Sequence, residues 1–467
     1  MPKYLVWFGH NNSYFGHRFR ELEALAHMNG VDVIDLYDGV QPNSLSADPY
    51  AIVHLPNDGV VESICQRSVL IKFVIELWGQ GVTDDAVMAQ VRETASPESW
   101  DRIFADSGFS YKVSSYGTQY TDLQRRGRME AFSTLFTGKE KVDLKHPKIV
   151  LHVIDVFEHV CTPTGPRLSP DVFSLHSFYG RQVSLSLNTF RERFVLTARP
   201  ILGPTSLDND LAFLMANMAE IGPGDAVFDP FCGTGGLLLT ASALTGLPPL
   251  GTDIDTRVLR GDLIAYVRND VVEGKDIFQN FIHYGLPVPE VVAVDNSRAP
   301  WRQESCFDVI LTDPPYGVRA GAKRIGARSV HTIGDRINYY PQMVGYKPED
   351  VNKDLLDRSA RMLHPGGRLV FLLHCELIDL FSTAELDQLR ATEPLSAKST
   401  KVCVQPSTGS EYVYAHECAR EDQFLNESTI VARVVPSHSD LKLVSAVLQI
   451  LSGGTGRILV VMRLNRL

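Results

Sequence analysis

The chain has 467 residues, of which 44% are hydrophobic and 21% are charged, and its formal net charge at pH 7 is −10. This length exceeds one ordinary domain of ~100–200 residues, so we expect two or three domains, and the composition is typical of a globular protein in water. The acidic balance argues against a protein that holds nucleic acid by bulk electrostatics, because phosphate contacts need Lys and Arg. Any RNA binding must therefore be local.

The sequence predicts neither a membrane segment nor a metal site. Its apolar stretches are far shorter than the ~20 residues that span a bilayer, and the first residues lack the long apolar run of a signal peptide. The seven cysteines are scattered and form no CxxC pair, which favours neither a disulfide framework nor a zinc site. We therefore expect a cytoplasmic protein with no metal and no membrane contact.

The predicted elements change in pattern near residue 197. Before it, short strand-like runs mix with amphipathic helices, which is typical of an α+β fold. The runs lie over 4–8, 51–55, 149–153 and 183–187, and the clearest helix over 19–27. After it, helices over 209–220, 237–244 and 355–363 alternate with strands over 226–228, 249–253, 291–294, 309–312 and 369–373. This alternation predicts a doubly wound α/β domain with a mostly parallel sheet.

A glycine-rich turn follows the predicted strand over 226–228. The segment Asp229-Pro-Phe-Cys-Gly-Thr-Gly-Gly places a carboxylate and the turn at the carboxyl end of a strand, where doubly wound sheets bind ligands. Asp253 closes the next strand, where its carboxylate can accept hydrogen bonds from both ribose hydroxyls. Asp295 closes the strand after it, where it suits the amino group of adenine. A dinucleotide turn is the nearest alternative, and helix capping is the commoner role of a single Asp. An Asp before the glycines instead suits the amino group of S-adenosylmethionine. The candidate cofactor residues here are Asp229, Phe231, Gly233, Gly235, Asp253, Ile254, Asp295 and Asn296.

The strand over 307–312 runs into the tetrad Asp313-Pro314-Pro315-Tyr316. Two adjacent prolines remove two N–H donors and stiffen the turn, which leaves carbonyl oxygens free to accept hydrogen bonds. Asp313 and the Pro314 carbonyl can accept both protons of an aromatic amine, and Tyr316 can stack on a base taken out of its helix. A plain turn is the alternative. Methylation of a pyrimidine carbon would need a cysteine nucleophile in this turn, which the sequence lacks. We predict a catalytic role for all four residues of the tetrad.

Two basic stretches are candidates for local RNA binding. A solvated charged face is the alternative for each of them. The first contains Arg181, Arg191, Arg193 and Arg199, and the second contains Arg319, Lys323 and Arg324.

Together these motifs resemble the catalytic subunit of the eukaryotic tRNA (guanine-N2)-methyltransferases that modify guanosine 10 of tRNA. The resemblance covers most of the chain and includes blocks outside the two motifs. These are Arg67-Ser-Val-Leu-Ile-Lys, Val142-Asp-Leu-Lys-His-Pro, Gly203-Pro-Thr-Ser-Leu-Asp and Asn280-Phe-Ile-His-Tyr-Gly-Leu. No family block follows Val404, and residues 407–426 are interpreted as an insertion.

The resemblance implies a fold, a reaction and partners. The implied fold is a ferredoxin-like α+β subdomain over 1–75, a THUMP-like RNA-binding domain over 76–196, and a Rossmann-like methyltransferase domain with a seven-stranded sheet over 197–467. The implied reaction is methyl transfer from S-adenosylmethionine to N2 of guanosine 10 after base flipping. In it Thr205 and Ser206 hold the methionine moiety, Asp253 the ribose and Asp295 the adenine. The implied partners are tRNA and a small zinc-binding activator subunit in a heterodimer.

Two further functions stay open from the residues alone. One is an amino-methyltransferase of rRNA guanine or DNA adenine, over which the THUMP-like resemblance favours tRNA. The other is a noncatalytic RNA-binding subunit that has kept the fold. Such a subunit would be expected to lose Asp313, Tyr316 or the glycine turn, and all three are intact.

Overall fold

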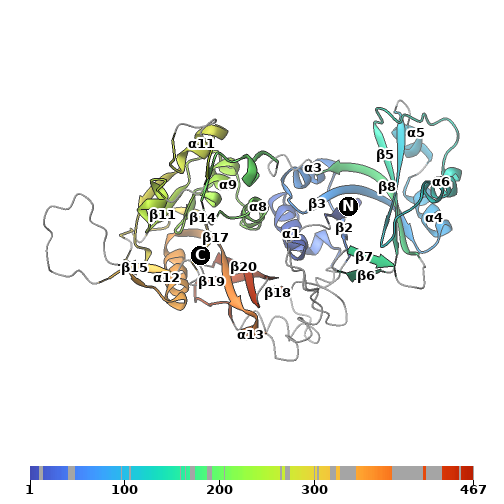
Figure 1. Cartoon of the computed structure of the whole chain (residues 1–467). Coiled ribbons are helices and arrows are strands. Elements are labelled where there is room, and N and C mark those ends of the chain that lie inside the picture. Colours follow the sequence, from blue (N-terminus) through green and yellow to red (C-terminus); the bar gives the residue numbers. More distant parts are fainter. Residues whose placement is uncertain are drawn as a thin grey trace, which may run out of the picture. The chain divides into compact units, whose positions relative to one another are not determined.

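The computed structural model describes most of the chain, in two compact units (Figure 1). The described residues are 1–9, 14–39, 48–95, 97–104, 107–157, 159–162, 165–168, 174–186, 192–203, 206–262, 266–268, 274–298, 300–301, 304–315, 322–326, 343–380, 414–416, 434–451 and 454–465. Those up to 186 form the N-terminal unit, and those from 192 onward form the C-terminal unit.

The N-terminal unit is built on a six-stranded sheet of order β2-β1-β3-β8-β5-β4. Strands β4 and β5 pair in parallel, and the other neighbours are antiparallel. The strands are β1 (Lys3–Phe8), β2 (Tyr50–His54), β3 (Ile71–Gly81), β4 (Phe109–Tyr116), β5 (Ile149–Phe157) and β8 (Ser174–Leu185), with a separate hairpin of β6 (His159–Thr162) and β7 (Gly165–Leu168). The helices are η1 (Phe15–His17), α1 (Arg18–Met28), α2 (Val33–Leu36), α3 (Asp58–Arg67), α4 (Asp84–Thr94), α5 (Pro97–Phe104), α6 (Asp122–Ala131) and η2 (Ser133–Leu135). The expected division at residues 75 and 76 falls inside β3, so both expected N-terminal segments share one sheet, and the division itself stays a prediction.

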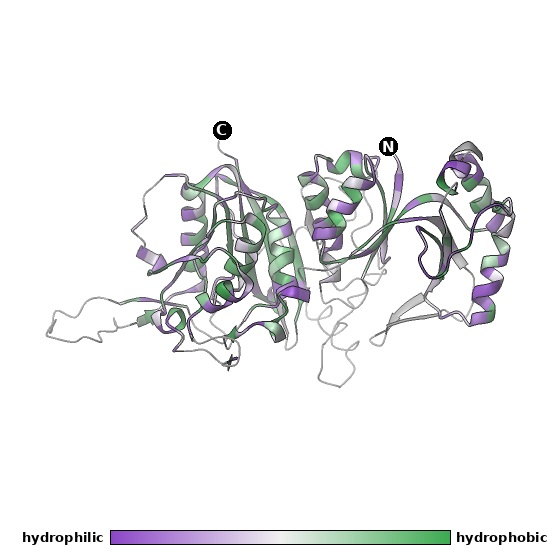
Figure 2. Cartoon of the chain, turned by 90° about the horizontal axis from the view of Figure 1, so that it is seen from above, coloured by the Kyte–Doolittle hydropathy of each residue, from purple (hydrophilic) through white to green (hydrophobic). Residues whose placement is uncertain are grey.

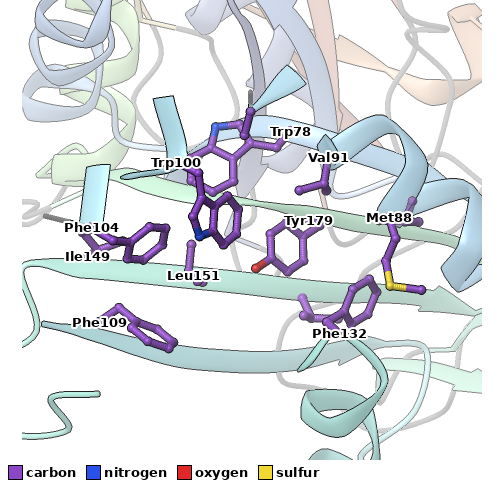
Figure 3. Close-up of a cluster of buried hydrophobic side chains, with 13 residues drawn as sticks. Trp78, Met88, Val91, Trp100, Phe104, Phe109, Phe132, Ile149, Leu151 and Tyr179 are labelled. Carbon is purple, nitrogen blue, oxygen red and sulfur yellow. The ribbon is translucent and has the colours of Figure 1, made fainter. Parts of the chain in front are cut away.

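Alternating side chains give the two faces of this sheet separate cores. Val153 belongs to one buried cluster and Ile154 to another, because successive residues of a strand point to opposite faces. In the first cluster, Val91 of α4 and Trp100 of α5 pack on Trp78 of the sheet (Figure 3). Each such large apolar side chain contributes about 1.5–3 kcal/mol when fully buried. The first cluster therefore fixes α4 and α5 on one face of the sheet.

The C-terminal unit has, among its described residues, an eight-stranded sheet of order β13-β11-β10-β14-β17-β20-β19-β18. The first five strands pair in parallel, and the last three join antiparallel. The strands are β10 (Val227–Asp229), β11 (Leu250–Asp253), β13 (Glu290–Ala293), β14 (Phe307–Thr312), β17 (Leu363–Glu376), β18 (Tyr414–His416), β19 (Leu441–Ile450) and β20 (Thr455–Leu464). Two short pairs join β9 (Ile201–Leu202) to β12 (Tyr266–Val267) and β15 (Lys323–Ile325) to β16 (Met343–Gly345).

The helices of this unit are η3 (Leu196–Ala198), α8 (Asn209–Met218), α9 (Gly236–Thr245), α10 (Thr256–Leu259), α11 (Phe278–Tyr284), η4 (Asn296–Arg298), α12 (Pro348–Met362) and α13 (Leu377–Leu380). Helix α9 lies between two glycines in the left-handed region, Gly235 at φ 78° and Gly246 at φ 70°. Helix α12 begins at Pro348, earlier than the predicted start at 355, because proline suits the first turn of a helix. Several helices carry both apolar and polar residues (Figure 2).

The sheet order confirms the predicted fold class, an α+β region followed by a mostly parallel doubly wound sheet. Strand β10 lies between β11 and β14, so the chain order reverses on either side of it. Ligands of such sheets bind at the carboxyl ends of the strands at this reversal. No strand is predicted from the sequence after residue 373, whereas the structure adds β18, β19 and β20. The described sheet therefore has eight strands instead of the expected seven. Within the described residues, no helix combines the length and the apolar character needed to cross a bilayer.

Candidate active site

The carboxyl ends of β10 and β14 are joined by one short hydrogen bond. Asp229 closes β10 and is 2% exposed, and its Oδ1 accepts the hydroxyl proton of Thr312 at 2.6 Å. The same oxygen accepts the backbone N–H of Phe231 at 3.0 Å. Thr312 is the residue before Asp313, so this bond brings the first residue of the tetrad to the edge that carries the glycine turn.

Burial makes Asp229 an unusual acid. Loss of water raises its pKa from 3.8 to about 7, and the negative charges of Asp313 and Asp253 act in the same direction. The bonds from Thr312 and Phe231 oppose the shift only in part. A buried carboxylate of this kind is stabilised in its charged form by a cation placed beside it. The end of β10 therefore suits a ligand with a positively charged group.

The glycine turn is fastened to the end of β11. Gly233 and Gly235 have φ angles of 50° and 78°, a region that residues with a Cβ seldom adopt. The Gly233 N–H donates to Oδ2 of Asp253 at 3.0 Å, and the Asp255 N–H donates to Oδ1 at 2.8 Å. Burial raises the pKa of Asp253. The turn and the acid predicted to hold ribose thus form one unit, with the half-buried Ile254 beside them.

The segment before α8 lies against this turn. A Cβ built on Gly203 would lie 2.2 Å from Cγ2 of Thr234, so only glycine allows this approach. Ser206 accepts the Gly203 N–H at 3.0 Å through its hydroxyl. Asn280 of α11 holds the same segment by bonding both the N–H and the carbonyl of Ile201 at 3.0 Å. Ser206 is therefore brought near the glycine turn, whereas Thr205 lies outside the described residues.

The two candidates after β13 are already bonded to protein groups. Oδ1 of Asp295 accepts the backbone N–H of Ser297 at 2.9 Å and the Ser297 hydroxyl at 2.7 Å. Oδ2 of Asp295 accepts the Ile325 N–H at 2.8 Å. Asn296 is 5% exposed, and both its amide nitrogen and its amide oxygen have protein partners. The structure thus gives Asn296 a role between strand ends, which differs from the predicted contact with a cofactor.

Phe231 turns toward the short hairpin of β15 and β16. It packs against the buried cluster of Ala322, Tyr346 and Val351. The Arg324 guanidinium carbon lies 5.9 Å from the centre of the Tyr346 ring, and Lys323 is exposed. The hairpin thereby carries two of the predicted RNA-binding cations next to the loop after β10.

Two predicted RNA-binding arginines have a different environment from the one expected. Arg199 is 3% exposed and donates to the Phe194 carbonyl and to Asn209 Oδ1, both at 3.2 Å. Burial lowers its pKa to about 10. Arg181 pairs with Asp58 at 2.7 Å and with Glu76 at 2.9 Å. The prediction that Arg199 binds RNA is wrong, because a guanidinium enclosed by protein cannot reach a phosphate. The charge of Arg181 is largely neutralised by its two carboxylate partners.

The other predicted residues divide into described and undescribed ones. Arg193 is exposed, and its guanidinium donates to the Tyr284 carbonyl at 2.7 Å. Pro314 is buried and Pro315 half-buried. Outside the described residues lie Tyr316, Arg191 and Arg319.

Three residues that shape the site were missed in the sequence. Thr312 could have been noticed as a polar residue that ends an apolar strand directly before the tetrad. Asn280 belongs to a block quoted only for its family resemblance. Arg358, which bonds Asn296, carries no local signal because its partner lies 62 residues away in the chain.

A parallel sheet in this order, with a glycine turn after β10 and an Asp-Pro-Pro turn after β14, defines a class I methyltransferase fold. The families whose sequence models match this chain agree with this fold assignment. Residues 2–186 match the Tmrp11 THUMP N-terminal domain, and residues 197–263 match the RMKL-like methyltransferase domain.

Relatives that match most of this chain identify the family within the class I methyltransferases. The chain is 30% identical over 391 residues to the tRNA (guanine(10)-N(2))-methyltransferase TRMT11 of Dictyostelium discoideum, which covers 80% of this chain and 74% of the relative. It is 31% identical over 389 residues to the tRNA (guanine(10)-N(2))-methyltransferase of Saccharomyces cerevisiae, and the match covers 79% of this chain and 84% of the yeast protein. With TRMT11 of Homo sapiens it shares 31% over 338 residues, covering 70% and 71%. The chain belongs to the tRNA (guanine(10)-N(2))-methyltransferase family.

Proposed function

We propose that the chain transfers a methyl group from S-adenosylmethionine to the exocyclic N2 of guanosine 10 in tRNA. The observation that carries this proposal is the 2.6 Å bond between Thr312 and Asp229. It joins the strand end that bears the amine-binding tetrad to the strand end that bears the buried acid and the glycine turn. Methyl donor and acceptor amine can therefore meet at one edge of the sheet.

The residues at this edge fit S-adenosylmethionine. Asp229 is buried with a raised pKa, which suits the cationic amino group of the methionine moiety. Gly233 has open space where a Cβ would be, so a ligand can approach the backbone there. Asp253 would accept hydrogen bonds from the ribose, Asp295 would face the adenine, and Ser206 with its neighbour Thr205 would hold the methionine end. When bound, the cofactor supplies the electrophilic methyl group of its sulfonium.

The tetrad would prepare the amine for attack. The lone pair of an aromatic amine is delocalised into the ring, so the free amine is a poor nucleophile. The Asp313 carboxylate and the Pro314 carbonyl would accept its two N–H groups and turn the lone pair toward the methyl group. Tyr316 would stack on the guanine after base flipping. Pro315 would keep the turn stiff.

RNA contacts would come from both units. The N-terminal unit, which matches a THUMP domain, would hold the tRNA, as the family resemblance implies. Near the site, we retain Arg193, Lys323 and Arg324 as RNA contacts, together with Arg191 and Arg319. A small zinc-binding activator subunit as partner and a cytoplasmic location are also proposed, from the resemblance and the sequence.

One experiment tests the proposal. The full chain, with and without a candidate zinc-binding activator, is incubated with labelled S-adenosylmethionine and, in parallel reactions, with tRNA, rRNA or DNA, and the labelled nucleoside is mapped. We expect N2-methylguanosine at position 10. Label in rRNA guanine or DNA adenine but not in tRNA would favour the alternative amino-methyltransferase. No label in any of these substrates would favour the noncatalytic subunit.

A further inference from the structure

Arg358 of α12 is bonded to the loop that follows β13. One of its guanidinium nitrogens donates to Asn296 Oδ1 at 2.7 Å, and the other donates to the Asn296 backbone carbonyl. Arg358 is half-buried and Asn296 is buried. A planar guanidinium can bond two acceptors on one residue in fixed geometry, which a lysine cannot do. The orientation of Asn296 is therefore set from α12.

Asn296 also forms hydrogen bonds to residues at the ends of two other strands. Its amide nitrogen donates to the Pro230 carbonyl after β10 and to the Thr252 hydroxyl in β11 at 3.3 Å. The Thr252 hydroxyl in turn donates to the same Pro230 carbonyl at 2.9 Å. All of these side chains except Arg358 are buried, so each bond lies where a lost partner leaves an unpaired polar group.

The three residues that this network joins at the strand ends each adjoin an acid of the proposed donor site. The pairs are Pro230 with Asp229, Thr252 with Asp253, and Asn296 with Asp295. A displacement of Asn296 would therefore shift all three acids relative to one another. Donor affinity would then fall although the three acids themselves remain.

The charges around Arg358 keep it in place. Burial lowers the pKa of Arg358, and Tyr346, Asp354 and Asp295 oppose this shift by favouring the charged form, while Arg361 adds to it. The Tyr346 hydroxyl donates to Asp354, which ties this side of α12 to the segment after β16. A glutamine at position 358 is shorter and has one donor nitrogen, so it cannot reproduce the two bonds that two guanidinium nitrogens make to Asn296.

We propose that Arg358 is a positioning residue for methyl-donor binding, acting through Asn296 on the ends of β10, β11 and β13. This inference rests on the proposed function, because it assumes that Asp229, Asp253 and Asp295 hold the donor. Arg358 itself would touch neither donor nor tRNA.

The test uses the full chain and S-adenosylhomocysteine as the probe, with binding measured by calorimetry. We expect R358Q to bind the probe at least 10-fold more weakly and to raise KM for S-adenosylmethionine similarly. The kcat and the KM for tRNA should stay within about 3-fold. R358K, which can keep one of the two bonds, should lie between R358Q and wild type. R361Q removes an exposed arginine one turn further along α12 and should match wild type.

Melting temperatures of all variants are measured to identify simple unfolding, and a second variant tests the next bonds of the network. N296D keeps an acceptor for Arg358 but loses the amide donor to Pro230 and Thr252, so it should also bind the probe at least 10-fold more weakly. The inference is overturned if R358Q binds the probe within 2-fold of wild type. It is equally overturned if kcat and tRNA affinity fall together with probe affinity, in proportion to a lower melting temperature. If the wild type binds the probe but methylates no tRNA, the proposed function fails, while probe binding by the variants still decides the role of Arg358.

Discussion

Replacing Asp229 with asparagine should stabilise the protein without cofactor while weakening the cofactor site. The folded pKa of about 7 lies above the ordinary value of 3.8. As pH rises, the unfolded chain therefore releases this proton first, and wild-type stability falls between about pH 4 and pH 7. Asparagine cannot ionise and can still accept the bonds from Thr312 and Phe231. D229N should therefore not lose stability over this pH range.

The size of the effect follows from the pKa. Each pKa unit corresponds to about 1.4 kcal/mol, so full ionisation of Asp229 costs the fold about 4 kcal/mol. Of this, about 2–3 kcal/mol falls between pH 5 and pH 8. For a unit of about 200 residues, 1 kcal/mol shifts the melting temperature by about 2–4 °C. The advantage of D229N over wild type should thus grow by about 5–10 °C from pH 5 to pH 8.

Scanning calorimetry of the full chain at both pH values measures this difference. D262N removes an exposed carboxylate of the same unit and should follow wild type at both pH values. An advantage of D229N that is equal at pH 5 and pH 8 would mean that Asp229 does not titrate between these pH values and that its folded pKa is not near 7. D229N should also bind S-adenosylhomocysteine at least 10-fold more weakly, since the charge facing the amino group is gone.

Three further substitutions test other parts of the site. G235A places a Cβ on a residue with φ 78°, at a cost of about 1–2 kcal/mol, and should lower both the melting temperature and probe affinity; an unchanged melting temperature would contradict the strain argument. G203A would bring a Cβ within 2.2 Å of Thr234 Cγ2 and should weaken probe binding, and the added change T234S should restore part of it; no restoration would show that this contact is not the cause. D313A should abolish methyl transfer in single-turnover assays while tRNA binding stays within a few-fold, and an active variant would remove Asp313 from the mechanism.

The parts of the site that are local in sequence were predictable. Asp229, Gly233 and Gly235 lie within one strand-turn-helix segment, and Asp313 directly follows an apolar strand. Because parallel strands end at the same edge of a sheet, the alternation of strands and helices was enough to bring these residues together.

The parts that depend on distant partners were not predictable. Arg199 was assigned to RNA because neighbouring cations suggested an exposed face, but tertiary packing encloses it. Asn296 looks like a ligand contact beside Asp295, and only the distant Arg358 reveals its place in the network. Strands β19 and β20 were missed because no motif or family block marks residues 441–464. The pairing of β20 with β17 links segments about 90 residues apart in the chain.

One substrate pair shows whether the exocyclic amine of guanosine 10 is the atom that accepts the methyl group. Single-turnover methyl transfer is measured with tRNA carrying guanosine at position 10 and with the same tRNA carrying inosine there. Inosine differs from guanosine only in lacking the 2-amino group. We expect transfer to the guanosine tRNA and no product at inosine 10. Methylation of inosine 10 at a rate within 10-fold of the guanosine substrate would show that another atom accepts the methyl group.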